Sequence, residues 1–377
     1  MMAVDTFFIS MFALTVTASL ISALSSSIII AMIFKSREGL STIFHRLMLA
    51  ISICDLISSL SMSVASIPCP TESGLLLASG SVATCDVQGF FNMFTLITPL
   101  YNSALCIHFL LAIKYEVSDA RRKFIDPFLL GIPALWGIFC SFYFLATNAF
   151  NAGPAGVCWV FESPIGCGNK GSGVECIRGS GAHDSLVYKT YLFLVFVVVP
   201  IIVFSSLFAI YKSVSKRETR SSSYGAASLN ITSRIPRSGR RQNNRLTLSR
   251  KSLHKLLAFS GAWFFTNILF IIVACTKRFA NVIAPRSIYL AMTFLYPLQG
   301  HFNFLIYVYP TVLNIKRSRN NYSWYEAFMR AVKSKLNLSL SDERRRRDLR
   351  FSLANTRQFE VCEPTDLATS SNQNTVP

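Results

Sequence analysis

The chain has 377 residues, of which 51% are hydrophobic and only 15% are charged, and its formal net charge is +18. Soluble domains usually carry about a quarter charged residues, whereas here long apolar blocks alternate with short charged segments. Lys and Arg are concentrated in particular loops between the apolar blocks. This distribution is typical of a membrane protein, whereas a nucleic-acid-binding domain would carry a basic patch on a soluble surface. We therefore expect membrane lipids, and no nucleic acid, among the partners.

Seven apolar segments are long enough to cross a membrane, because a helix through a hydrocarbon core of about 30 Å needs roughly 20 residues. They are Phe7–Phe34, Ile43–Ile67, Cys85–Tyr115, Phe128–Ala149, Leu186–Tyr211, Leu253–Thr276 and Ala284–Tyr309. We therefore predict an all-α membrane protein with a bundle of seven transmembrane helices over residues 7–309. Residues 1–6 carry Asp5 in place of a basic stretch, and the first block is longer than the roughly 7–15 apolar residues of a signal peptide. This favours a retained first span after a short extracellular N-terminus.

Prolines mark two kinds of position in these segments. The pair Asp126-Pro127 predicts the start of the fourth span, as an N-cap followed by proline at the first helical position. Other prolines fall inside spans, which membrane helices tolerate because neighbouring groups satisfy the freed carbonyl. These are Pro99, Pro133, Pro200 and Pro297.

Loop charge sets the direction of the bundle, because cytoplasmic loops carry an excess of Lys and Arg. The loops after spans 1, 3 and 5 are basic, whereas the loop after span 2 has no Lys or Arg and the loop after span 4 has only Lys170 and Arg178. The loop after span 6 is an exception, with Lys277, Arg278 and Arg286. We therefore predict a cell-membrane protein with an extracellular N-terminus and a cytoplasmic C-terminus.

The cytoplasmic segments divide into three parts. Residues 213–252 are rich in Ser and Arg and predict a basic, disordered third cytoplasmic loop. Within residues 310–336, the stretch Tyr322–Leu336 places aromatic and apolar residues at helical spacing with Lys and Arg between them, which predicts an amphipathic cytoplasmic helix in the membrane interface. Residues 337–377 include the run Arg344–Arg347 and predict a disordered tail attracted to anionic lipid.

Polar residues inside spans are candidates for function, because they are costly in a membrane. We predict a polar switch network formed by Asp55, Asn102, Asn267, Gln299, His301 and Asn303. The alternative is a purely structural set of hydrogen bonds that holds helices together. The chain lacks the motifs of hydrolases, zinc proteases and phosphate-binding loops, and span 7 has no Lys for a retinal Schiff base. We therefore expect neither an enzyme nor a cofactor.

The seventh span carries the most specific motif, Tyr296-Pro-Leu-Gln-Gly-His-Phe-Asn-Phe-Leu-Ile-Tyr307. It resembles the seventh-helix signature of cyclic-AMP-receptor-like and secretin/adhesion-like G-protein-coupled receptors, in which Gln-Gly-Phe-Phe-Asn is typical; His301 departs from that pattern. Cys158-Trp159 is similar to the Cys-Trp of their second outer loop. The Asp-Arg-Tyr and Asn-Pro-x-x-Tyr motifs of rhodopsin-like receptors are missing, although Asp55 resembles their helix 2 acid.

This resemblance implies several expectations about the site. An extracellular ligand would bind between the helices, and a heterotrimeric G protein would bind the cytoplasmic face at Lys114, Tyr115, Arg121, Arg122 and Lys255. Cys158 would form a disulfide with Cys85, and we predict a second, loop-internal disulfide between Cys167 and Cys176. Cys69 is left free or paired with Cys275.

The ligand pocket is predicted only by spacing. Gln88, Asn92 and Thr95 share one face of the outer half of helix 3, and Tyr289 lies at similar depth in span 7. Hydrogen bonding between helices is an equally good explanation of each. A transporter or a membrane scaffold without G-protein coupling is the alternative function. A permeation path would need a continuous stripe of ionisable residues, and a scaffold would not need the span 7 motif.

Overall fold

The computed structural model describes most of the predicted bundle. The described residues are 6–36, 38–117, 119–164, 167, 173–228, 253–269, 272, 285–318 and 322–336. Most of the third cytoplasmic loop (229–252), the tail (337–377) and Cys275 therefore lie outside the described residues, as does the end of the sixth predicted span.

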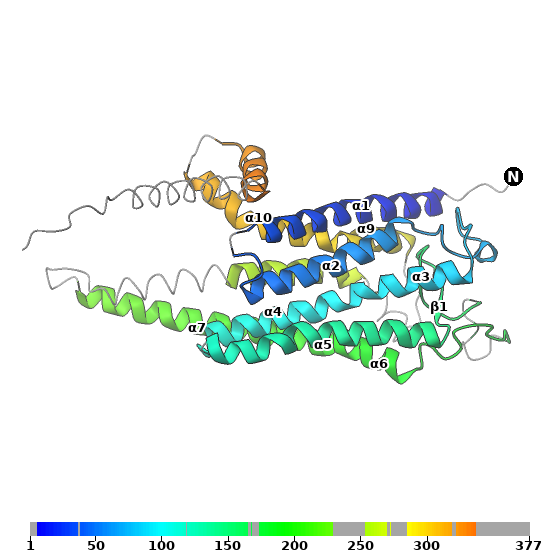
Figure 1. The fold of residues 1–377 in the computed structure, drawn as a ribbon, viewed down its shortest axis with the longest axis horizontal. Coiled ribbons are helices and arrows are strands. Elements are labelled where there is room, and N and C mark those ends of the chain that lie inside the picture. Colours follow the sequence, from blue (N-terminus) through cyan, green and yellow to red (C-terminus); the bar gives the residue numbers. More distant parts are fainter. Residues whose placement is uncertain are drawn as a thin grey trace, which may run out of the picture.

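Long helices run side by side in an elongated bundle (Figure 1). In chain order the described helices are α1 (Thr6–Lys35), α2 (Ile43–Ser63), α3 (Val82–Asn92), α4 (Ile97–Ile113), α5 (Asp119–Ala146), α6 (Leu186–Phe193), α7 (Val199–Ser228), the helix of residues 253–269, α9 (Arg286–Leu295), α10 (Gln299–Ser318) and the helix of residues 324–336. The last of these lies outside the bundle, beyond the end of α10 (Figure 1). Among the described residues, five helical segments are long and apolar enough to cross a membrane: Thr6–Lys35, Ile43–Ser63, Val82–Ile113, Lys123–Ala146 and Leu186–Arg217.

The buried face of α1 shows how the bundle packs. It carries small residues at helical spacing, including Ala18, Ser19, Ser22 and Ser26, which allow neighbouring backbones to approach closely. The opposite face exposes large apolar side chains, such as Leu24 at 65%. A helix that packs small residues inside the bundle and exposes large apolar residues outside it is one that faces lipid on one side.

Among the described residues, three short turns interrupt the α-helical spans, and each lies near a proline of the spans. The 3-10 turn η2 (Met93–Leu96) precedes Pro99, the π-helical turn η3 (Leu194–Val198) precedes Pro200, and the 3-10 turn η5 (Tyr296–Leu298) contains Pro297. Proline lacks the N–H that would bond the carbonyl four residues earlier, so the backbone before it changes its hydrogen-bond spacing.

The predicted helix start at Asp126-Pro127 is wrong. α5 begins at Asp119, so Pro127 lies inside the helix and Asp126 is not its N-cap. Pro127 deprives the carbonyl of Lys123 of its helical donor, and both residues are exposed, so water can take that place. Helices also extend further than predicted elsewhere. α7 continues to Ser228, into the segment expected to be disordered, and α10 continues to Ser318.

Loops and two strands close one end of the bundle, which we call the disulfide end because it contains Cys85 and Cys158. There β1 (Phe150–Ala152) and β2 (Cys158–Val160) form an antiparallel hairpin that packs on α3 (Figure 1). The short helix η1 (Thr71–Ser73) lies in the loop between α2 and α3. At the other end, which we call the basic end, lie the C-terminal ends of α4 and α7 and the N-terminal ends of α5 and the helix of residues 253–269 (Figure 1).

Candidate functional site

A chain of hydrogen bonds crosses the bundle through four helices. The Asp55 carboxyl group of α2 accepts bonds of 2.8 Å from Thr98 Oγ1 on α4 and from Asn303 Nδ2 on α10. Asn303 Oδ1 accepts a bond of 3.3 Å from Gln299 Nε2, one turn earlier on α10. Gln299 Oε1 accepts a bond of 2.5 Å from Thr266 Oγ1 on the helix of residues 253–269. The network therefore links α2, α4, α10 and that helix.

Four of the six residues predicted to form the polar switch network belong to it. Asn267 joins through its Nδ2, which donates to Thr266 Oγ1 at 3.0 Å and to the Trp263 carbonyl at 2.9 Å. Asp55, Gln299 and Asn303 are the other three, and all of them are buried. Losing a partner of a buried polar group costs about 1–3 kcal/mol, so the network holds these helices in one arrangement.

The two other predicted members lie apart. The His301 ring is hydrogen-bonded through Nδ1 to Ser25 Oγ of α1 at 2.9 Å, so it fastens α10 to α1. Asn102 is buried on α4, and neither of its amide atoms has a hydrogen-bond partner among the described residues. Thr98 and Thr266 were not predicted, because apolar spans contain many Thr residues and nothing in their spacing distinguishes these two.

Gly300 sets the distance between α10 and its neighbours. A Cβ atom added there would lie 2.3 Å from Ser26 Oγ and 2.7 Å from Ser22 Oγ, both on α1. The Gly300 N–H donates to Ser22 Oγ at 3.2 Å, and Ser59 of α2 donates to the same oxygen at 3.0 Å. This close approach brings Asn303, one turn further along, within reach of Asp55.

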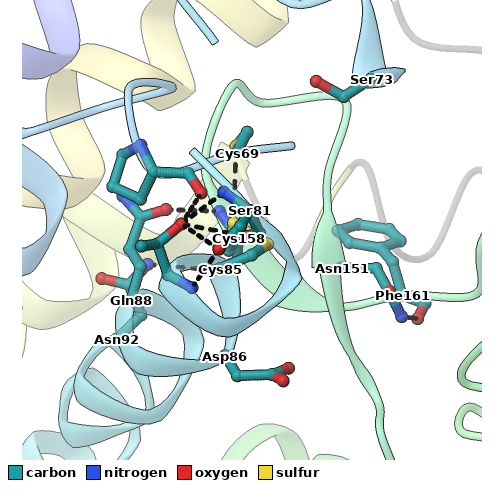
Figure 2. The surroundings of a disulfide bond; sticks show 12 residues. Cys69, Ser73, Ser81, Cys85, Asp86, Gln88, Asn92, Asn151, Cys158 and Phe161 are labelled. Atoms are coloured by element: carbon teal, nitrogen blue, oxygen red, sulfur yellow. Dashed lines mark hydrogen bonds between the residues drawn. A yellow bond between two sulfur atoms is a disulfide. The ribbon is translucent and has the colours of Figure 1, made fainter. Parts of the chain in front are cut away.

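At the disulfide end, Gln88 and Asn92 hold the β2 strand to α3. Gln88 Oε1 accepts a bond of 3.0 Å from the Cys158 N–H, and Asn92 Nδ2 donates to the Cys158 carbonyl at 3.0 Å (Figure 2). Gln88 Nε2 also donates to the Ala65 carbonyl at 2.7 Å. Both side chains are therefore engaged with main chain and buried, which favours the alternative of structural hydrogen bonding over a role in a ligand pocket.

The other two candidate pocket residues are partly buried, Thr95 on η2 and Tyr289 on α9. A hollow at the disulfide end is lined by residues of α1 and of two loops, and none of the four candidate residues contributes to it. Its lining residues include Met11, Phe12, Thr15, Ser66, Leu76 and Gly156.

Two disulfides are present in the described part of the chain, Cys85–Cys158 and Cys167–Cys176, which are the two expected pairings. The first ties α3 to β2, and the second closes a short loop after β2. Cys69 is a free, buried thiol. A partly buried ion pair, unexpected from sequence, adds to these links, since Arg178 Nη2 lies 2.9 Å from Asp86 Oδ1 of α3.

At the basic end, four of the five residues predicted to contact a G protein have described side chains. Lys114, Tyr115 and Arg121 are exposed, and the Lys114 ammonium lies 5.0 Å from the centre of the Tyr115 ring. The Lys255 ammonium lies 5.2 Å from the centre of the Phe44 ring. The side chain of Arg122 lies outside the described part of the structure.

An ion pair that was not predicted joins α7 to the residues that follow α4. Arg217 Nη2 lies 2.6 Å from Glu116 Oε1 and donates to the Ile113 carbonyl at 2.8 Å. Glu116 has a positive φ of 48°, a backbone conformation that is uncommon outside glycine. The two residues are 101 positions apart, so sequence spacing gives no sign of the contact.

The helix of residues 324–336 docks on the basic end through Lys335. Its ammonium lies 3.9 Å from the centre of the Tyr307 ring of α10. The pKa of Lys335 is lowered to about 8, mainly by burial and also by the nearby positive charge of Lys255, while Glu38 acts in the opposite direction. Two cations from different elements, Lys335 and Lys255, therefore lie close enough to interact, with Glu38 nearby.

Comparison with known proteins identifies the fold. The bundle is similar to the crystal structure of squid rhodopsin, with a TM-score of 0.56 and 18% sequence identity over 86% of this chain and 85% of that one. The chain therefore has the fold of a G-protein-coupled receptor. With its apolar helices, this makes it a multi-pass membrane protein. No family model matches the sequence, and no curated protein matches it either.

Proposed function

We propose that this protein is a seven-helix G-protein-coupled receptor of the cell membrane, with an extracellular N-terminus and a cytoplasmic C-terminus. The receptor-like fold supports the bundle, and loop charge supports the orientation. In this proposal the helix of residues 253–269 belongs to the sixth span, and α9 with α10 forms the seventh. The disulfide end is then extracellular and the basic end cytoplasmic.

The observation that carries this proposal is the hydrogen-bond network from Asp55 to Thr266. It joins the helix of residues 253–269 to α2 and α10 through the Gln299 and Asn303 side chains of the seventh-span motif. A receptor needs a bundle with two arrangements, and an agonist shifts their populations only through its different affinity for each. A buried network that must exchange partners when one helix moves is a suitable element for such a switch.

The same motif favours the cyclic-AMP-receptor-like or secretin/adhesion-like receptors over the rhodopsin-like ones. Gln299, Gly300 and Asn303 match that pattern, and each contacts another helix. His301 departs from it and is bonded to Ser25, a contact that the usual Phe could not make.

Binding partners follow from the two ends of the bundle. An extracellular ligand would enter at the disulfide end, where Thr95 and Tyr289 remain candidates for contact with it. A heterotrimeric G protein would bind the basic end through Lys114, Tyr115, Arg121 and Lys255. The helix of residues 324–336, with Trp324 and Tyr325 exposed, would lie in the inner membrane interface among lipids.

Nucleotide exchange on G proteins tests the proposal. The purified full chain in lipid bilayers is combined with a panel of G proteins and of ligands that includes cyclic nucleotides. We expect ligand-dependent exchange with at least one G protein, and reduced ligand dependence in Gln299→Ala. Leu24→Ala, which changes a side chain on the outer face of α1, serves as the matched control and keeps the response. Absence of exchange under every condition would favour a membrane scaffold or a transporter.

A further inference from the structure

A third cysteine lies against the disulfide that joins α3 to β2. Cys69, in the loop after α2, is completely buried, and its Sγ lies 3.4 Å from Cys158 Sγ. The sulfur atoms of Cys69, Cys85 and Cys158 all lie within 4.8 Å of one another (Figure 2). Cys158 is already bonded to Cys85, so the Cys69 thiol is the donor in this contact.

The main chain keeps Cys69 in this position. Its N–H donates to the Ser66 carbonyl at 3.0 Å, and its carbonyl accepts a bond of 2.9 Å from the Gly80 N–H. A Cβ atom at Gly80 would lie 2.2 Å from the Pro68 carbonyl oxygen, so the loop closes tightly at this point. The thiol is therefore held beside the disulfide by local backbone structure.

Cys158 is also held without help from its disulfide. Its N–H and carbonyl are fixed by Gln88 and Asn92, both on α3. At Cys158, a change of sulfur partner therefore needs rotation of the side chain and no movement of the backbone, because these two hydrogen bonds keep the backbone in place.

We propose that Cys69, Cys85 and Cys158 form an exchangeable disulfide site, in which Cys158 pairs with either Cys85 or Cys69. The Cys69 thiol loses its proton, and the thiolate attacks Cys158 Sγ. The Cys69–Cys158 bond forms as the Cys85–Cys158 bond breaks, and Cys85 leaves with the electron pair of that bond and takes up a proton. One disulfide and one thiol are present before and after, so no oxidant or reductant is consumed.

Exchange is slow in the resting arrangement for two reasons. Burial raises the pKa of the Cys69 thiol to about 11, and only the thiolate attacks a disulfide. A disulfide bond is about 2.0 Å long, so a straight line of attack would place the outer sulfur atoms more than about 5 Å apart. The sulfur atoms of Cys69 and Cys85 lie closer together than that, so the Cys69 side chain must rotate before its thiolate can displace Cys85.

The two forms differ in what the disulfide restrains. In the Cys85–Cys158 form, β2 is covalently tied to α3, whereas in the Cys69–Cys158 form it is tied to the loop between α2 and α3. In that form, the hydrogen bonds of Gln88 and Asn92 with Cys158 and the ion pair of Asp86 with Arg178 still join α3 to β2 and the loop that follows it.

Peptide mapping of the full chain in bilayers tests the proposal directly. The protein is incubated at pH 7, 8 and 9, acidified, treated with a maleimide at mildly acid pH and digested without reduction. Pepsin is needed, because there is no Lys or Arg between Arg46 and Lys114 and trypsin would leave Cys69 and Cys85 in one peptide. We expect a Cys69–Cys158 peptide and a labelled Cys85, appearing about tenfold faster for each pH unit. A Cys85–Cys158 peptide alone, at every pH and time, would overturn the proposal.

Variants give a second, independent measurement. In Cys85→Ser, we expect a Cys69–Cys158 disulfide and a higher thermal midpoint than in the double variant Cys69→Ser/Cys85→Ser, which cannot form it. Cys69→Ser alone is the matched control and keeps the Cys85–Cys158 disulfide at every pH. Free, labelled Cys69 and Cys158 in folded Cys85→Ser would contradict the proposal. If Cys85→Ser does not fold, the peptide mapping of the unaltered chain alone decides whether Cys158 exchanges its disulfide partner.

Discussion

Asn303 of α10 donates a 2.8 Å hydrogen bond to the carboxyl group of Asp55 on α2, across 248 positions of sequence. Both side chains are buried, and each has one further partner, Thr98 for Asp55 and Gln299 for Asn303. The bond is therefore the link through which the α2–α4 side of the network reaches the helix of residues 253–269.

Asn303→Ala should destabilise the bundle, because it leaves one oxygen of a buried carboxyl group and the Gln299 amide without a partner. A loss of about 1–3 kcal/mol is expected, measured as a lower thermal midpoint of the purified protein in bilayers. Ser205→Ala is the control, since that hydroxyl is exposed and bonds only the Ile202 carbonyl of its own helix. Equal midpoints for the two variants would show that the link contributes little.

Removal of the ion pair between Arg217 and Glu116 should loosen α7 from the end of α4. Glu116→Gln is expected to raise basal nucleotide exchange by about fivefold at most, because a partly exposed ion pair contributes up to about 1 kcal/mol. The side chains are 29% and 57% exposed for Arg217 and Glu116, so high salt should reduce the difference.

Two further variants separate this effect from a general loss of charge. The exchanged pair Glu116→Arg/Arg217→Glu should return basal exchange toward that of the unaltered protein. Lys216→Met, at the neighbouring exposed position, should leave it unchanged. If Lys216→Met raised basal nucleotide exchange as much as Glu116→Gln, the increase would be due to the change in net charge and not to loss of the ion pair.

Hydropathy did not predict where several of the helices begin and end. Residues 119–126 contain Arg121, Lys123 and Asp126, so the apolar signal of the fourth span starts only at Phe128, although α5 begins at Asp119. A hydropathy pattern reports contact with the membrane, whereas a helix can continue into water as long as its backbone bonds are made. The extensions of α7 and α10 have the same cause.

Helical spacing placed polar residues on the correct faces but could not say what covers those faces. Gln88 and Asn92 do share one face of α3, yet β2 lies over it, because the fold of the loop after α5 brings Cys158 there. The proximity of Cys69 to Cys158 depends on that same loop. Contacts between segments this far apart follow from tertiary structure, and one sequence carries no local signal of them.

The pKa of Lys335 gives the docking of the helix of residues 324–336 a definite pH dependence. In the docked helix this pKa is about 8, against an ordinary value of 10.5. Between these values the undocked helix binds more protons, so docking strengthens as pH rises from 8 toward 10.5, and the full penalty of the buried charge applies below 8.

Hydrogen exchange of residues 324–336, corrected for the intrinsic effect of pH on amide exchange, measures this dependence. Protection should increase between pH 7 and 9.5 in the unaltered chain and stay nearly constant in Lys335→Met. Lys333→Met removes an exposed charge from the same helix and should keep the increase. The charged groups around Lys335 include Lys255 and Glu38, so Lys255→Met should shift the increase to higher pH.

Gly300 gives a test of how closely α10 must approach α1. Gly300→Ala should destabilise the bundle by about 1–3 kcal/mol, because its Cβ would lie 2.3 Å from Ser26 Oγ and 2.7 Å from Ser22 Oγ, so that the serine side chains or the helices must move. Any separation of the helices also lengthens the bond from Asn303 to Asp55, so the variant should lower the thermal midpoint and raise basal nucleotide exchange together. Gly131→Ala in α5 is the matched control. Its Cβ would meet nothing within 4 Å, and alanine favours a helix over glycine by about 1 kcal/mol, so its midpoint should stay the same or rise.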